Sequence, residues 1–151
     1  MRKQIALLCS VLALLAAGGC HQEELPPVPK LSANCACVVR YKDVSYNCRI
    51  GFLSKDVETI TIQTPAALSG LTFSKGQGQY KLSYGSLVCR SDSALLPQQS
   101  LPQKITNAVH DFRRQPQSLQ AEKTGTGYTF TSPAYALVTD AEGLIREIHL
   151  Q

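Results

Sequence analysis

The sequence has no tryptophan, a single methionine and no cluster rich in lysine and arginine. Its formal net charge of +4 over 151 residues is too small to indicate a nucleic-acid partner or an acidic substrate. Known catalytic patterns are also missing, since there is no Gly-x-Ser-x-Gly, no His-Glu-x-x-His and no phosphate-binding loop. We find no nucleophile beside a base. The sequence therefore predicts no enzyme, no catalytic residue, no cofactor and no bound nucleic acid.

The first segment has the composition of an export signal. Arg2 and Lys3 precede an uncharged apolar stretch over 5–17, which is shorter than the about 20 residues that span a bilayer. Gly18, Gly19 and Cys20 follow, and this ending resembles the bacterial lipobox, although Ala17 stands where that motif usually has leucine. The resemblance implies that residues 1–19 are a lipoprotein signal peptide and that Cys20 is lipidated. An ordinary secretory signal with a chance cysteine is the alternative.

Residues 20–34 are predicted to form a lipidated tether. The stretch HQEELPPVPK after Cys20 holds three prolines, which favour an extended polyproline geometry. Two or three acyl chains on one cysteine hold a protein stably at a membrane. We therefore expect a chain bound through its N-terminal lipid to the extracytoplasmic face of the cell membrane. Because His21 and not aspartate follows the cysteine, the outer membrane is the expected destination in a cell with two membranes.

The 132 residues that remain after the signal peptide are enough for one domain with a buried core. This domain is predicted to cover residues 35–151. Alternation of apolar and polar residues predicts most of its strands, and Gly76 and Gly78 indicate a hairpin. Gly85 is interpreted as a bulge, after which Leu87 and Cys89 continue the same strand. The predicted strands cover 38–41, 44–52, 57–64, 71–74, 80–84, 127–131, 134–139 and 144–150.

One helix is predicted over 100–113. Ser100 can cap it, and Pro102 lies in its first turn, where the missing N–H costs nothing. One apolar face is formed by Leu101, Ile105, Ala108, Val109 and Phe112. The neighbouring His110 and Asp111 should diverge by about 100° around the helix and form no dyad, so the three histidines of the chain are interpreted as solvated. Strands, a helix and further strands predict an antiparallel α+β domain.

The run ITIQTPAALSGLTFSKGQGQYKLSYGSL resembles a stretch of small lipoproteins of clostridial-type bacteria, in which a strand ends in proline and a glycine hairpin follows. Those proteins, which include a germination-type lipoprotein, are similar to the LolA-like lipoprotein carriers. The resemblance covers roughly 38–151. It implies a curved antiparallel half-barrel with the helix on its concave side. It also implies carriage of a lipid or another apolar ligand, although this chain is short for the family.

Four cysteines remain once Cys9 and Cys20 are set aside: Cys35, Cys37, Cys48 and Cys89. An even number in an exported domain indicates disulfides. A hairpin turning at residues 42–43 would place Cys37 opposite Cys48, and Cys35 could pair with Cys89 if strand 80–90 lay beside it. The pattern therefore predicts disulfides or buried free thiols. A zinc site is disfavoured, because its paired ligands prefer two to four intervening residues.

These observations predict a membrane-anchored, non-enzymatic interaction or accessory module that docks a protein partner by a sheet edge or the helix. The alternative is a carrier of lipid or another apolar ligand in a half-barrel groove. An apolar internal cavity would favour the carrier, whereas a filled core would favour the interaction module.

Overall fold

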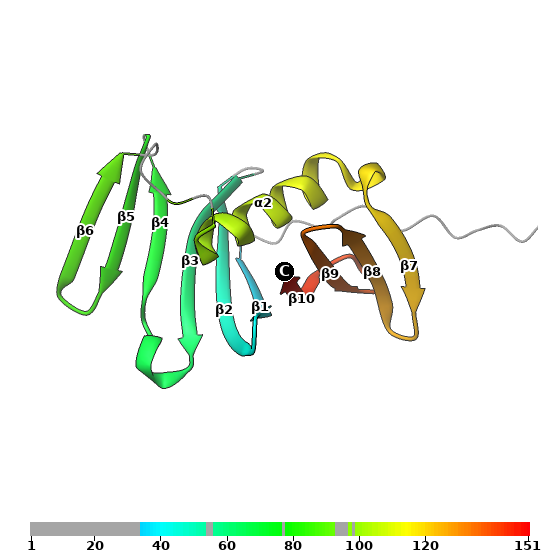
Figure 1. The fold of residues 1–151 in the computed structure, drawn as a ribbon, viewed down its shortest axis with the longest axis horizontal. Coiled ribbons are helices and arrows are strands. Elements are labelled where there is room, and N and C mark those ends of the chain that lie inside the picture. Colours follow the sequence, from blue (N-terminus) through cyan, green and yellow to red (C-terminus); the bar gives the residue numbers. More distant parts are fainter. Residues whose placement is uncertain (1–33, 54–55, 77, 93–96, 98) are drawn as a thin grey trace, which may run out of the picture.

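The computed structural model describes residues 34–53, 56–76, 78–92, 97 and 99–151, so the signal peptide, Cys20 and nearly all of the predicted tether lie outside the described residues. Ten strands form one open, curved sheet with a single long helix against it (Figure 1). The first six strands are β1 Asn34–Tyr41, β2 Val44–Leu53, β3 Asp56–Thr64, β4 Thr72–Gly76, β5 Gln79–Tyr84 and β6 Leu87–Asp92. The helix α2 Leu101–Arg114 follows, and then β7 Gln120–Thr124, β8 Gly127–Ser132, β9 Tyr135–Asp140 and β10 Ile145–Leu150.

The sheet consists of two antiparallel halves joined in the middle. Its strand order is β6-β5-β4-β3-β2-β1-β10-β9-β8-β7, so the chain builds one half outward to β6 and the other half inward from β7. The first and last strands, β1 and β10, meet as the parallel pair, with Val39 opposite Ile148 and Tyr41 opposite Leu150. The α+β class is confirmed in this broad sense, as a mainly antiparallel sheet with one helix.

Helix α2 carries the chain between the two halves and covers the middle of one face of the sheet, which we call the helix face; the opposite side is the outer face. Its buried residues are Ile105, Ala108, Val109 and Phe112, as the periodicity predicted. They pack on β3, β9 and β10, and the ring of Phe112 meets that of Phe130 edge-on with 4.7 Å between centroids. The most deeply buried sheet residues are Val39, Ile50, Leu137 and Ile148.

The helix is too short to cover the whole face. Its 14 residues span about 21 Å at 1.5 Å per residue, whereas ten strands about 4.8 Å apart span about 43 Å. The helix therefore protects the junction of the two halves. The end of the helix face over β5 and β6 remains exposed, as the large apolar side chains Leu82, Tyr84 and Leu87 show.

The structure corrects several boundaries. Gly85 is no bulge: with φ of 56° it forms a two-residue turn with Ser86, and β5 and β6 are separate strands of a hairpin. β1 begins at Asn34, so Cys35 and Cys37 lie inside a strand. β7 was not predicted, because its sequence QAEKT is exposed at every position and shows no alternation. The predicted turn at residues 42–43 is confirmed, with Lys42 at φ 54°.

One glycine is required by close packing. A Cβ on Gly127 would lie 1.9 Å from the backbone oxygen of Thr139 on the adjacent strand, far inside contact distance. Thr139 is itself buried, and its hydroxyl donates a hydrogen bond of 3.4 Å to the carbonyl oxygen of Tyr128. Any larger residue at position 127 would therefore push β8 and β9 apart.

The side chain of Phe112 tests the helix packing. We expect Phe112→Ala to lower the free energy of unfolding by about 3–5 kcal/mol, because a fully buried ring that meets Phe130 would be replaced by a cavity. Asn107→Ala, on the exposed side of the same helix, should change it by less than about 0.5 kcal/mol. Urea unfolding of both variants measures the difference, and equal effects would show that α2 does not hold the core.

Candidate functional site

The exposed end of the helix face carries an apolar surface. Leu82 and Tyr84 on β5 lie opposite Cys89 and Leu87 on β6, and all four side chains share one face of this hairpin. Leu87 is 72% exposed, the highest value among the exposed large apolar residues. Next to these four, Phe73 and Tyr80 stack with 5.1 Å between their centroids and continue the surface into the core. We call Leu82, Tyr84, Leu87 and Cys89 the edge patch.

The two edges of the sheet differ in character. β6 begins with Leu87, Val88 and Cys89, which are exposed, while β7 reads Gln-Ala-Glu-Lys-Thr. Charged residues on an edge strand discourage pairing with another chain, and an apolar edge lacks that protection. The first half of the β6 edge is therefore the better template for an added strand, whereas Arg90 and Asp92 place charges on its second half.

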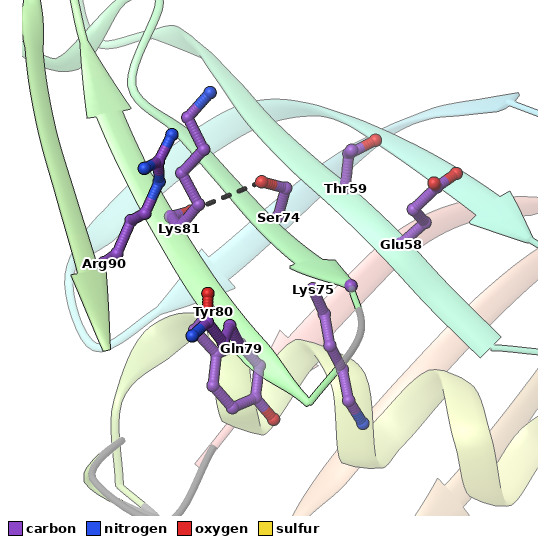
Figure 2. A pocket seen from close by; sticks show the side chains of 9 residues that line it. Glu58, Thr59, Ser74, Lys75, Gln79, Tyr80, Lys81 and Arg90 are labelled. Atoms are coloured by element: carbon purple, nitrogen blue, oxygen red, sulfur yellow. Dashed lines mark hydrogen bonds between the residues drawn. The ribbon is translucent and has the colours of Figure 1, made fainter. Parts of the chain in front are cut away.

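A hollow of about 330 Å³ lies along the same hairpin. Figure 2 shows Thr59, Ser74, Lys81 and Arg90 on neighbouring strands, with Glu58 at the far side and with Lys75 and Tyr80 pointing the other way. A second hollow, of about 210 Å³, lies between β3, β4 and the helix and is lined by Val57, Lys75, Gln103, Thr106, Asn107 and His110. Most side chains that line these two hollows are polar or charged, which does not suit a lipid chain. A larger hollow, of about 470 Å³, lies at the turn between β7 and β8, where Tyr128 and Ala141 line it beside polar residues.

Three of the predicted site cysteines come together in the core. Cys37 lies directly opposite Cys48, as the register predicted, and Cys35 lies two residues before Cys37 on the same face of β1. Cys37 and Cys48 are buried and Cys35 is half-buried. All four described cysteines are free thiols in this structure.

The ladder sets the spacing of the opposed pair. Tyr41 and Val44 close a two-residue turn and are hydrogen-bonded partners, and hydrogen-bonded pairs alternate with open pairs along the strands. Counting from the turn, Cys37 and Cys48 occupy a hydrogen-bonded pair, the wider type. Their Cβ atoms are then about 5.5 Å apart, against about 3.8 Å in a disulfide. A bridge at this site needs the strands to move closer, and it stays a prediction.

The remaining cysteine is far from the other three. Cys89 lies on the edge strand β6, and four strands separate β6 from β1. Five spacings of about 4.8 Å put Cys35 and Cys89 about 24 Å apart, whereas the Cα atoms of a disulfide lie about 4.4–6.8 Å apart. The predicted pairing of Cys35 with Cys89 required their strands to be neighbours, and this condition is therefore not met.

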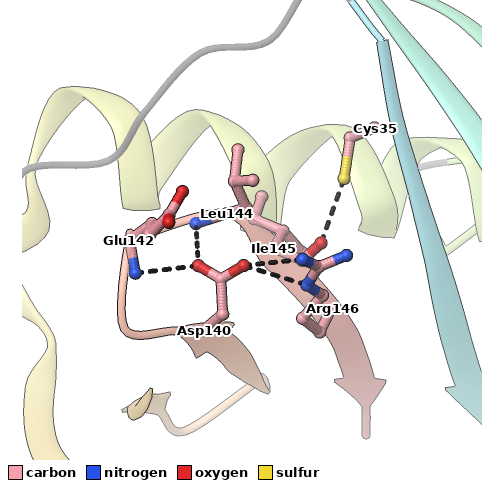
Figure 3. A network of polar contacts seen from close by, with 6 residues as sticks. All are labelled: Cys35, Asp140, Glu142, Leu144, Ile145 and Arg146. Atoms are coloured by element: carbon pink, nitrogen blue, oxygen red, sulfur yellow. Dashed lines mark hydrogen bonds and ion pairs between the residues drawn. The ribbon is translucent and has the colours of Figure 1, made fainter. Parts of the chain in front are cut away.

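The environment of the buried thiols keeps two of them protonated. Burial raises the pKa of Cys48 to about 11. The pKa of Cys37 is raised further, first by the neighbouring thiol of Cys35 and then by burial. The neighbouring Cys37 in turn lowers the pKa of Cys35, whose Sγ donates a hydrogen bond of 3.1 Å to the carbonyl oxygen of Ile145 (Figure 3). Since the thiolate is the reactive form, Cys37 and Cys48 are poor nucleophiles at neutral pH.

The turn beside Cys35 is held by a carboxylate. Asp140 accepts hydrogen bonds from the backbone N–H of Glu142 and of Leu144 and from the guanidinium of Arg146, at 2.7–3.0 Å (Figure 3). Burial alone would raise the pKa of Asp140, but these hydrogen bonds outweigh it and the pKa lies below its usual value. Both carboxylate oxygens of Asp140 accept hydrogen bonds from residues close by in the chain, so Asp140 orders the turn between β9 and β10.

A second polar chain links α2 to β9. The hydroxyl of Tyr135 donates a hydrogen bond of 3.0 Å to Asp111, and Asp111 approaches the ring of His110 at 3.5 Å. Adjacent helix residues were expected to diverge, and the approach is at the outer limit of a hydrogen bond. Burial, and after it the bond to Asp111, raises the pKa of Tyr135. The tyrosine therefore keeps its proton and anchors the helix.

No protein-family model, no curated protein and no solved structure matches the chain. The resemblance to LolA-like carriers remains an expectation. Among the described residues, no group of three or more His, Cys, Asp and Glu side chains is arranged to hold a metal ion. No helix within that part of the chain is long and apolar enough to cross a membrane.

The thiols should react in an order set by their exposure. We expect iodoacetamide to modify Cys89 first in the folded chain, because Cys89 is exposed, whereas Cys37 is 6% and Cys48 1% exposed. Peptide mapping by mass spectrometry measures each site. Cys37 and Cys48 should become modifiable only after unfolding; a linked pair of their peptides that persists without reductant would instead identify the predicted bridge. Modification of Cys48 as fast as Cys89 would contradict the packing.

Proposed function

We propose that this chain is a lipid-anchored, non-enzymatic interaction module on the extracytoplasmic face of a bacterial membrane, and that it docks an extended strand of a protein partner along β6. The observation that carries the docking site is the open edge of β6, with Leu87 72% and Val88 51% exposed. A partner strand added there would gain main-chain hydrogen bonds and would cover the edge patch. Most side chains that line the hollows of about 330 and 210 Å³ are polar or charged, which favours this role over that of a carrier for apolar ligands.

The hairpin identifies the backbone groups that a partner would use. Tyr84 and Leu87 close a two-residue turn and are hydrogen-bonded partners, so Leu87, Cys89 and Ser91 direct their backbone groups toward β5. The N–H and C=O groups of Val88, Arg90 and Asp92 then point outward from the sheet. These residues form the free edge.

A proline at the free edge tests the docking mode. Val88→Pro removes an outward N–H and leaves the hydrogen bonds to β5 in place, because proline is tolerated where the N–H faces solvent. With a photo-crosslinking residue at Leu87 in the producing cells, we expect a crosslinked partner with the natural residue at position 88 and at least a tenfold weaker product with Val88→Pro.

Ala121→Pro on β7 is the matched control, since Ala121 lies three positions before the turn partner Thr124 and its backbone also points outward from the sheet. The control variant should crosslink as the unmodified chain does. Crosslinking that is insensitive to both prolines would contradict strand addition at β6, and so would equal loss in both variants.

The predicted anchor is tested separately. Cys20→Ala should release the protein from the membrane fraction or leave it at precursor size, because no thiol remains to carry the lipid. Fractionation with immunoblotting measures both. A Cys20→Ala chain that still sediments with membranes at the size of the processed protein would show that the lipobox interpretation is wrong.

A further inference from the structure

The outer face of the β5–β6 hairpin holds two cations in an unfavourable position. Lys81 lies directly opposite Arg90, and three positions separate each from the turn partners Tyr84 and Leu87. The alternation of the ladder makes Lys81 and Arg90 an open pair, in which the Cα atoms are only about 4.5 Å apart. Like charges that face each other across a strand pair destabilise the sheet. This arrangement calls for an anion between the two side chains.

Hydroxyl groups extend the cation pair across the sheet. Ser74 lies opposite Lys81, and Thr59 lies opposite Ser74, so Arg90, Lys81, Ser74 and Thr59 form one row across β6, β5, β4 and β3. Figure 2 shows the Lys81 and Arg90 side chains on the same side of the sheet as the Ser74 and Thr59 hydroxyls. All four residues line the hollow of about 330 Å³. We call these four residues the outer row.

Neighbouring carboxylates do not neutralise the pair. Glu58 lines the same hollow but lies on β3, two strands from Lys81, or about 9.6 Å at 4.8 Å per strand. Asp92 follows Arg90 by two positions on the same face of β6. Among the described residues, neither Lys81 nor Arg90 forms an ion pair within 4.0 Å with either carboxylate. The two positive charges are therefore available to a ligand.

We propose that the outer row is a binding site for a phosphate group. The guanidinium of Arg90 offers a planar pair of donors that matches two phosphate oxygens, and the ammonium of Lys81 adds a compact charge beside it. The hydroxyl of Ser74 is within 3.5 Å of the Lys81 carbonyl oxygen and can rotate toward a bound oxygen instead. A lipid headgroup and a free phosphate compound present the same chemistry. The site uses side chains of the outer face and is independent of the β6 backbone edge.

Binding is measured on residues 20–151 with Cys20→Ser, so that neither the predicted signal peptide nor a lipid anchor contributes. Inorganic phosphate is titrated by calorimetry, and sedimentation compares vesicles of phosphatidylcholine alone with vesicles that also contain phosphatidylglycerol. Lys81→Gln/Arg90→Gln should weaken binding about tenfold or more, because hydrogen bonds to charged groups are lost. Lys42→Gln/Lys123→Gln removes the same net charge from exposed positions outside the row and should have little effect.

Stability of the variants separates loss of binding from loss of folding. Lys81→Glu replaces a like-charged pair by an opposite-charged pair, so it should abolish phosphate binding while the unfolding temperature stays equal or rises. Glu58→Gln should strengthen binding slightly, since it removes a negative charge from the far side of the hollow.

The two probes distinguish the source of the phosphate. Saturable binding of inorganic phosphate without preference for the anionic vesicles supports a free phosphate compound, and a preference for anionic vesicles that depends on the row supports a headgroup. Absence of both overturns the proposal. Equal losses in the two double variants also overturn it, because the effect would then be one of net charge.

Discussion

The parallel pairing of β1 with β10 holds this domain together. Each half of the sheet is a local meander of antiparallel strands, and only the contact between the first and last strands merges them. Parallel strands are slightly less stable per residue than antiparallel ones and are usually covered. Helix α2 provides that cover, since its buried face with Ile105, Val109 and Phe112 packs on β9 and β10 on one side of the junction and on β3 on the other. The outer face of the junction is reinforced by Glu147, which accepts hydrogen bonds from Arg40 and His149.

The same arrangement leaves one end of the sheet unprotected. A helix that spans about half of the width of the sheet can cover either the β1–β10 junction or an edge, and here it covers the junction. The β5–β6 hairpin consequently has both faces available. Its helix face carries the edge patch, its outer face carries the row of Lys81 and Arg90, and its rim carries unpaired backbone groups. The features proposed for binding are centred on this hairpin, and Ser74 and Thr59 extend the outer row onto β4 and β3.

Two-residue turns determine the fine spacing of these features. Each such turn specifies which opposite residues are hydrogen-bonded and which form the closer open pairs. The turn at Lys42 and Asp43 puts Cys37 and Cys48 at the wider spacing, which suits packed free thiols better than a bridge. The turn at Gly85 and Ser86 puts Lys81 and Arg90 at the closer spacing, where an anion is most useful. The same turn directs the backbone of Val88 outward.

The sequence by itself determined the local elements of this domain. Alternation of apolar and polar residues was enough to predict most strands. The turn at 42–43 placed Cys37 opposite Cys48, and the apolar stripe of α2 identified the residues that the helix buries. β7 was not predicted, because this edge strand has no buried side to impose alternation. β6 was predicted only as a continuation of the strand before it, because Gly85 was interpreted as a bulge and not as a turn. Only the tertiary structure decided that β1 meets β10, that Cys89 lies far from Cys35, and that Lys81, Arg90, Ser74 and Thr59 share a row. The β1–β10 pairing joins the two ends of the domain, and it depends on the helix that carries the chain from one half of the sheet to the other. The outer row and the distance between Cys35 and Cys89 follow from the order and register of consecutive strands, which several turns determine together and no single local pattern encodes.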